Sequence, residues 1–160
     1  MAVGAENSGK MVSTLRQQAF LLGQEQKTDL VLIDGAPGIG CPVIAAVTGV
    51  DLALIISEPT LSGAHDLERA LQICRHFHIA TVVCINKADI NLLQADTISK
   101  RCLDLGVPLL PRIPYDEVAI SAMRQGRAVT EFGENKVADA LRLVWAELQQ
   151  RLKTNILNTN

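Results

Sequence analysis

Asp34 is the first residue whose type and setting could do chemistry. It closes an apolar stretch over 29–34 and precedes a loop that contains Gly35, Gly38 and Gly40. A carboxylate fixed at this place can hold Mg²⁺ through a bound water, while backbone amides of the loop approach a terminal phosphate. The pattern therefore indicates a magnesium and phosphate site. The alternative is a strand-end aspartate that only caps a turn.

Asn86 and Asp89 form a second candidate group, in an Asn-Lys-x-Asp sequence after an apolar stretch over 79–86. The Asn86 amide can both donate to and accept from the edge of a purine base, and the Lys87 stem can lie along the base. A carboxylate at Asp89 can accept from guanine N1–H and N2–H₂, which adenine lacks. The alternative is a polar turn in which Asp89 or Asn91 caps the next helix.

The segment 4–10 has the Gly-x-x-x-x-Gly-Lys spacing of a phosphate-binding loop, but its surroundings argue against that function. Residue 11 is methionine, so the hydroxyl that would bind Mg²⁺ is missing. The residues before Gly4 are too few for the strand that leads into such a loop. We instead expect a flexible arm over 1–12, with Lys10 opening the first helix.

Four apolar runs bounded by turn residues must position these side chains, and each is predicted to be a buried strand. They cover 29–34, 51–57, 79–86 and 107–113. Near-continuous apolar strands that alternate with helices indicate an α/β fold, with a mostly parallel sheet and helices on both faces. Ligands bind beyond the carboxyl ends of the strands in such sheets, where the candidate residues lie.

Helical periodicity fills the segments between the strands. It predicts helices around 15–22, 67–77, 92–103 and 134–152, with Ser62 as the cap of the second. In the last helix, the stripe predicted to face the core consists of Val137, Leu141, Val144, Trp145, Leu148 and Leu152. A polar tail that frays is expected over 153–160.

Length and composition narrow the function classes. The chain has 160 residues, of which 48% are hydrophobic, 20% charged and 3% aromatic, and a net charge of −2. This size predicts one domain, and the charge and aromatic content give no reason to expect nucleic acid binding. The sequence contains neither a run of about 20 apolar residues nor a secretory signal, so we expect no membrane association and a cytoplasmic location.

The cysteines indicate packing more than chemistry. The sequence has 4 cysteines, without a Cys-x-x-Cys pair among them. Cys74, Cys84 and Cys102 lie in apolar periodic segments, where a free cysteine behaves as a small hydrophobe. We therefore expect no iron–sulfur cluster in this chain.

Taken together, the strand ends resemble the second half of a MinD/ParA-type P-loop ATPase. This is the CobQ/CobB/MinD/ParA nucleotide-binding family, and the resemblance is strongest to its subgroup with a ferredoxin-like insert. The stretch 5–12 is similar to the one that follows that insert. The segments that carry the resemblance are 31–40, 51–60, 85–89, 113–116 and 122–126.

The resemblance implies a P-loop NTPase-like three-layer fold, incomplete here, and a role for each matched residue. Asp34 would be the catalytic Walker-B acid near Mg²⁺, and Gly35 and Gly38 would belong to the phosphate-sensing loop. Asn86 would contact the adenine edge, and Pro114 and Asp116 would line the base pocket. Asp89 joins this candidate nucleotide-binding group through its own motif, described above. ATP and Mg²⁺ are the implied ligands of the complete protein. The family hydrolyses ATP between two facing subunits and uses the cycle to switch partner binding, which implies a homodimer.

The chain departs from the family pattern in one large respect. The family's amino-terminal glycine-rich Walker A loop with its lysines is absent, as are the Cys-x-x-Cys runs of the insert. That loop provides most of the phosphate stabilisation. We therefore expect a partial nucleotide-binding domain over 13–152 that is inactive alone.

Two other functions remain open. The chain could be a stand-alone, non-catalytic module that binds a protein partner through the strand ends or the Trp145 helix. A GTP-specific site through Asn86 and Asp89 is the second alternative.

Overall fold

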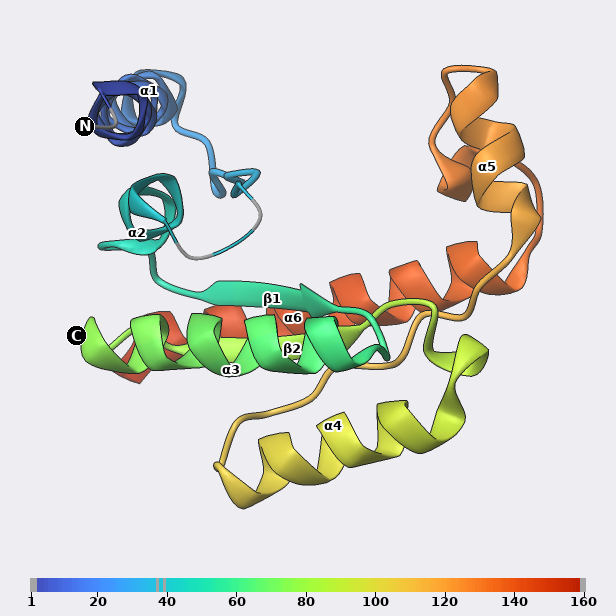
Figure 1. The fold of residues 1–160 in the computed structure, drawn as a ribbon. Coiled ribbons are helices and arrows are strands. Elements are labelled where there is room, and N and C mark those ends of the chain that lie inside the picture. Colours follow the sequence, from blue (N-terminus) through green and yellow to red (C-terminus); the bar gives the residue numbers. More distant parts are fainter. Residues whose placement is uncertain (1–2, 37, 39, 159–160) are drawn as a thin grey trace. The chain divides into compact units, whose positions relative to one another are not determined.

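The computed structural model describes residues 3–36, 38 and 40–158, with the side chains of 9–36, 38 and 40–154. The chain divides into two compact units, which are described separately. The first unit comprises Met1–Val50 with Arg69–Ile79, and the second comprises Asp51–Glu68 with Ala80–Asn160. The elements are drawn in Figure 1 and run in the order α1 (Val3–Gln26), α2 (Cys41–Val47), β1 (Ala53–Ser57), α3 (Leu61–His76), β2 (Thr81–Ile85), η1 (Ala88–Ile90), α4 (Leu92–Asp104), α5 (Glu117–Arg124), η2 (Val129–Glu131) and α6 (Lys136–Asn158).

The second unit is built on a parallel pair of strands. β1 and β2 pair in register from Ala53 opposite Thr81 to Ser57 opposite Ile85. These strands lie within the predicted ranges 51–57 and 79–86, so both predictions are confirmed. The chain has the α/β fold with a parallel sheet that the sequence indicated.

The segment 107–113 runs beside β2 as an irregular third strand. Val83 donates its N–H to the Pro108 carbonyl at 3.0 Å, and Leu110 donates to the Val83 carbonyl at 2.8 Å. The parallel bridge between Val83 and Leu109 has the expected direction. Proline has no N–H, so Pro108 and Pro111 interrupt the ladder and only part of the predicted strand forms.

The predicted strand over 29–34 is wrong in the structure. Residues 30–36 have no regular secondary structure, and the Leu32 side chain is 80% exposed. A strand requires a hydrogen-bonded neighbour, and no described residue pairs with this segment. The apolar sequence alone therefore does not make it a strand.

The core of the second unit lies between β2 and α6. Val82 and Cys84 point to α6, while Val83 and Ile85, on the opposite face of the strand, are also buried, so β2 is covered on both faces. The α6 residues in this core are Val137, Ala140, Val144 and Leu148, with Leu141 and Leu152 packed against them.

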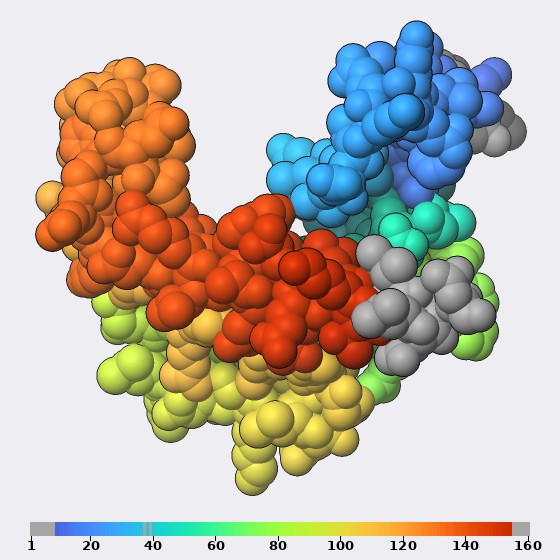
Figure 2. All heavy atoms as spheres, turned by 180° about the vertical axis from the view of Figure 1, so that it is seen from behind, coloured from blue at the N-terminus to red at the C-terminus, as the bar shows by residue number. Residues whose placement is uncertain are grey.

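Trp145 does not belong to the buried stripe of α6, contrary to the sequence prediction. Its side chain is 43% exposed, whereas Ala138 is fully buried. At about 100° per residue, Ala138 and Trp145 lie on the same side of α6, at the edge of the buried stripe. There the small alanine is fully covered, while the larger indole is only partly covered. Figure 2 views the molecule from the side of α6, whose outer face is open.

Helix ends differ from the predictions at several places. α1 begins at Val3, not at Lys10, although the residues before Lys10 include the poor helix formers Gly4 and Gly9. α6 continues to Asn158, into the predicted tail. The cap of α3 is Thr60 and not Ser62, since Thr60 Oγ1 accepts from the Gly63 N–H at 2.9 Å. The domain boundaries at 12 and 152 stay predictions.

The long helices show no membrane span. Among the helical residues that the structure describes, no stretch is both long and apolar enough to cross a bilayer.

Candidate functional site

The carboxyl ends of the strands in the second unit are tied together by backbone hydrogen bonds. Asn86, which follows β2, donates its N–H to the Ser57 carbonyl at 2.8 Å. Ala88 donates to the Ile113 carbonyl at 2.9 Å. The loops that follow β1, β2 and the 107–113 segment therefore leave the sheet at one edge.

Lys87 is held by an acid from the neighbouring loop. Its backbone is left-handed, with φ at 53°, and its N–H donates to Asn86 Oδ1 at 3.0 Å. Its Nζ lies 2.7 Å from Glu58 Oε1. The Lys87 stem, predicted to lie along a base, is thus directed to the loop after β1.

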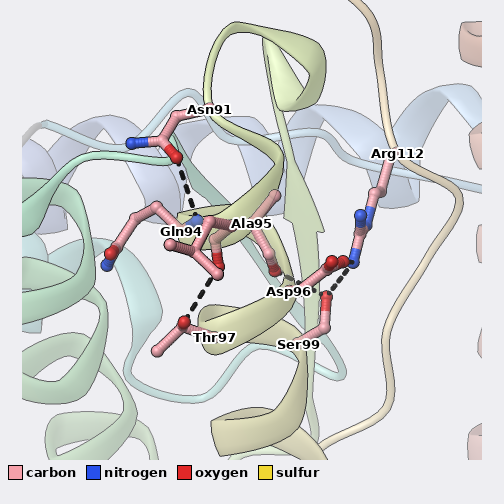
Figure 3. Close-up of polar contacts among 8 residues, drawn as sticks. Asn91, Gln94, Ala95, Asp96, Thr97, Ser99 and Arg112 are labelled. Atoms are coloured by element: carbon pink, nitrogen blue, oxygen red, sulfur yellow. Dashed lines mark hydrogen bonds and ion pairs between the residues drawn. The ribbon is translucent and has the colours of Figure 1, made fainter.

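Asp89 connects the 86–89 loop to the segment after Ile113. Its Oδ1 accepts the Tyr115 N–H at 2.7 Å, and its Oδ2 lies 3.9 Å from Lys136 Nζ. The Tyr115 hydrogen bond, more than the Lys136 charge, lowers the pKa of the Asp89 carboxyl. Of the two caps considered for α4, Asn91 is the one observed, accepting from the Gln94 N–H at 3.0 Å (Figure 3).

Asp116 and Pro114 lie in the adjoining segment. Asp116 caps α5, since its Oδ1 accepts the Val118 N–H at 3.0 Å. Its Oδ2 lies 3.6 Å from Lys136 Nζ. Pro114 is half-buried between Ile113 and Tyr115. The structure therefore brings the predicted base-binding residues Asn86, Asp89, Pro114 and Asp116 to one edge of the second unit.

An arginine fixes the strand that leads into this segment. Arg112 Nη2 donates to Asp96 Oδ1 at 2.7 Å and to Ser99 Oγ at 2.8 Å, as Figure 3 shows. Both acceptors lie on α4, so the end of the 107–113 segment is attached to a helix. Ser99 in turn donates to the Ala95 carbonyl at 2.9 Å.

Asp34, Gly35 and Gly38 belong to the first unit. Asp34 is exposed, and no ion pair of its carboxylate occurs among the described residues. Gly38 has φ at +92°, a conformation that favours glycine, and open space lies where a Cβ would be. The neighbouring positions 37 and 39 lie outside the described residues.

The Asp34 setting fits a magnesium ion bound through water. Mg²⁺ keeps several waters and needs only one or two carboxylates when phosphates supply the other ligands. The described residues contain no cluster of three or more His, Cys, Asp or Glu side chains that could hold a metal by themselves. Asp34 could therefore contribute to such a site with a nucleotide, as a single carboxylate.

Sequence reasoning missed Lys136, the cation between Asp89 and Asp116. Its only sequence signal is a lysine after Asn135 at the start of a helix, where cations are unfavourable. It also missed Glu58, the partner of Lys87, because nothing in the spacing relates the two loops.

Comparisons with known proteins find relatives that match this chain over part of its length. No family model matches the chain. A stretch of 91 residues is 37% identical to the uncharacterized protein MJ0578 of Methanocaldococcus jannaschii, covering 57% of this chain and 32% of that protein. A putative septum site-determining protein MinD of Oltmannsiellopsis viridis is 31% identical over 107 residues, covering 64% of this chain and 34% of that one. The chain thus spans about a third of these two relatives.

Solved structures share the fold. The MinD cell division protein of Aquifex aeolicus superposes with a TM-score of 0.69 at 17% identity, over 94% of this chain and 62% of that one. A ParA family ATPase of Chlorobium tepidum TLS gives a TM-score of 0.53 at 22% identity, over 67% of this chain and 44% of that one.

Proposed function

The chain is MinD/ParA-like in fold and, over part of its length, in sequence, and from this premise we propose that it provides the base-binding and magnesium side of a MinD-type ATP site. One observation carries the proposal. The residues predicted to surround the base come from separate segments, yet Asp89 accepts from Tyr115 N–H and shares Lys136 with Asp116. These segments converge at the carboxyl edge of a parallel sheet, which is where nucleotides bind in this fold class.

Each residue has a proposed part. Asn86 reads the edge of the base, and Pro114 and Asp116 line its pocket. Asp34 holds Mg²⁺ through a water, which makes it the acid on which catalysis depends. Gly35 and Gly38 let the loop amides approach the terminal phosphate, since glycine permits a close backbone approach.

The state of Asp89 favours adenine over guanine. A guanine reader needs a carboxylate with both oxygens open to N1–H and N2–H₂. Asp89 Oδ1 already accepts the Tyr115 N–H, and its Oδ2 faces Lys136. We therefore propose ATP and not GTP as the nucleotide. In this proposal the main part of Asp89 is to hold the 86–89 loop to Tyr115, and its contact with the base is secondary.

The phosphate-binding part of the site is proposed to come from a segment outside these 160 residues. Backbone donors and a lysine on the phosphates contribute most of the affinity in such sites. The complete protein is then a cytoplasmic ATPase that acts as a homodimer and switches a partner protein.

Titration with Mg-ATP tests this proposal on the 160-residue chain. Calorimetry is expected to give a dissociation constant larger than about 1 mM, which corresponds to a binding free energy less favourable than roughly −4.1 kcal/mol. At several millimolar Mg-ATP, backbone NMR shifts are expected at 86–89 and 113–116. Asn86→Ala should abolish those shifts, while Gln94→Ala on α4 should leave them.

Three outcomes would contradict parts of the proposal. Micromolar affinity would contradict the proposal that the phosphate-binding part of the site lies outside this chain. Shifts produced by Mg-GTP alone, and lost in Asp89→Ala, would favour the guanine site. An absence of shifts at both loops with either nucleotide would favour a non-catalytic, partner-binding module. The DNA sequence upstream of Met1 is a separate check, because an in-frame glycine-rich lysine loop would support the ATPase.

A further inference from the structure

We propose that Lys136 is a positioning residue, which with Asp89 and Asp116 forms an ionic clasp that fixes the 86–89 loop against the 113–116 segment. The clasp consists of these three side chains. Its geometry is independent of any nucleotide, but its use rests on the proposed function, because the segments it joins are those expected to bracket the base.

The two carboxylates are arranged in the same way. Each accepts a backbone N–H with one oxygen, Asp89 from Tyr115 at 2.7 Å and Asp116 from Val118 at 3.0 Å. Each has its other oxygen near Lys136 Nζ, at 3.9 Å for Asp89 and 3.6 Å for Asp116. The lysine therefore joins two carboxylates that are already held by the backbone.

Without a cation these carboxylates would repel each other. Like charges that share a site raise the free energy of the arrangement and favour separation. Since Asp89 holds the loop after β2 and Asp116 begins α5, separation would move the two segments apart. Lys136 offsets this repulsion by facing both.

The place of Lys136 is fixed by the start of α6. Asn135 Oδ1 accepts the Ala138 N–H at 2.8 Å, and Asn135 Nδ2 donates to the Val129 carbonyl at 3.2 Å. Val137, which follows Lys136, is buried in the core. A lysine in the first turn of a helix is unfavourable against the helix dipole, unless acids nearby stabilise it. The clasp supplies those acids.

Protonation of Asp89 provides a readout. The pKa of its carboxyl is lowered by the Tyr115 hydrogen bond and by the Lys136 charge, while desolvation opposes both. A lowered pKa in the folded chain means that the stabilisation is present at neutral pH and is lost as the pH falls through the folded value. The charged groups recorded at this carboxyl are Lys136 and, across it, Asp116.

The experiment follows the Tyr115 amide by NMR during an acid titration of the full chain, in wild type, Lys136→Met, Lys136→Arg and Lys100→Met. The amide reports the ionisation of Asp89 because it donates to Asp89 Oδ1. Lys136→Met should move the midpoint to higher pH, toward the ordinary aspartate value. Lys136→Arg should restore the wild-type midpoint. Lys100→Met, which removes the same charge from an exposed position on α4, should leave the midpoint unchanged.

The same spectra test the positioning role. In Lys136→Met, amide exchange at Tyr115 and in 86–89 should become faster, while the β2 amides keep their protection. A wild-type midpoint in Lys136→Met, or equal exchange rates at these loops, would overturn the clasp. Added adenosine separates the two proposals, because a failure of adenosine to shift either loop contradicts the base site but leaves the titration result standing.

Discussion

Cys84 is a single residue whose surroundings decide its chemistry. Its side chain is fully buried on β2, and its Sγ donates to the Pro111 carbonyl at 3.2 Å. Burial raises the pKa of the Cys84 thiol to about 11. Because the thiolate is the reactive form, this cysteine is expected to be inert at neutral pH.

We predict that Cys41 reacts first when the native chain is treated with a thiol reagent. Cys41 is exposed, whereas Cys74, Cys84 and Cys102 are buried. The raised pKa alone lowers the thiolate fraction of Cys84 by on the order of 10²-fold relative to an ordinary cysteine. Mass spectrometry after timed alkylation measures the rates. In urea all four should react, and similar native rates at Cys41 and Cys84 would contradict the prediction.

The cap of α3 gives a second prediction for single residues. Thr60→Ala removes the acceptor for the Gly63 N–H, and capping losses of this kind cost about 1 kcal/mol of the free energy of unfolding. Ser62→Ala is the matched control and should cost at most a few tenths. Urea denaturation measures both. A larger loss in Ser62→Ala would mean that Ser62 is the cap, as the sequence predicted.

At the scale of elements, α6 carries most of one face of the core, and its stripe allows a paired prediction. Leu148 is 7% exposed and Leu143 is 59% exposed on the same helix. Leu148→Ala should lower the free energy of unfolding by ~2–5 kcal/mol, because it leaves a cavity against β2. Leu143→Ala should change it by less than about 0.5 kcal/mol. Equal effects in urea denaturation would contradict the assigned face.

Local signals allowed the prediction of some elements and not others. Apolar runs placed β1 and β2, and Asn91 was one of two named caps, since these features depend on neighbouring residues. The predicted buried stripe of α6 is correct except for Trp145. This residue has helical spacing to the stripe, but spacing alone does not show how far a large side chain is covered. The strand over 29–34 failed because its formation requires a partner strand, which a run of apolar letters cannot supply.

The candidate site was predictable in its residues and not in its connections. Asn86, Asp89, Pro114 and Asp116 were named from strand ends and a family resemblance, and they do lie at one edge. Lys136 comes from a helix that begins 20 residues after Asp116 (136 − 116). No spacing rule relates an ion pair between elements so far apart in the chain, so only the fold reveals it.

At the scale of the whole molecule, burial is unequal between the amino-terminal part of the first unit, up to Val50, and the strands of the second unit. The other part of the first unit, Arg69–Ile79, contains the buried Leu71 and Cys74. Within residues 9–36, 38 and 40–50 of the first unit, Gly9 and Ala46 are the only buried positions. Apolar side chains there are exposed, among them Met11 at 61%, Phe20 at 59% and Leu32 at 80%. β2 in the second unit is buried from Val82 to Ile85. Regions with little buried apolar surface open at low free energy.

We therefore predict that native-state hydrogen exchange separates the amino-terminal part of the first unit, up to Val50, from the second unit. Amides of α1 and of 27–36 should exchange with opening free energies several kcal/mol below those of β2, which should approach the global value. Leu148→Ala provides the control, since it weakens the core around β2 and should lower protection there while leaving α1 unchanged. Equal protection of α1 and β2, or an equal loss at both in the variant, would show that these two regions open as one cooperative body. Limited proteolysis adds an independent measurement, with first cleavage expected in 27–36.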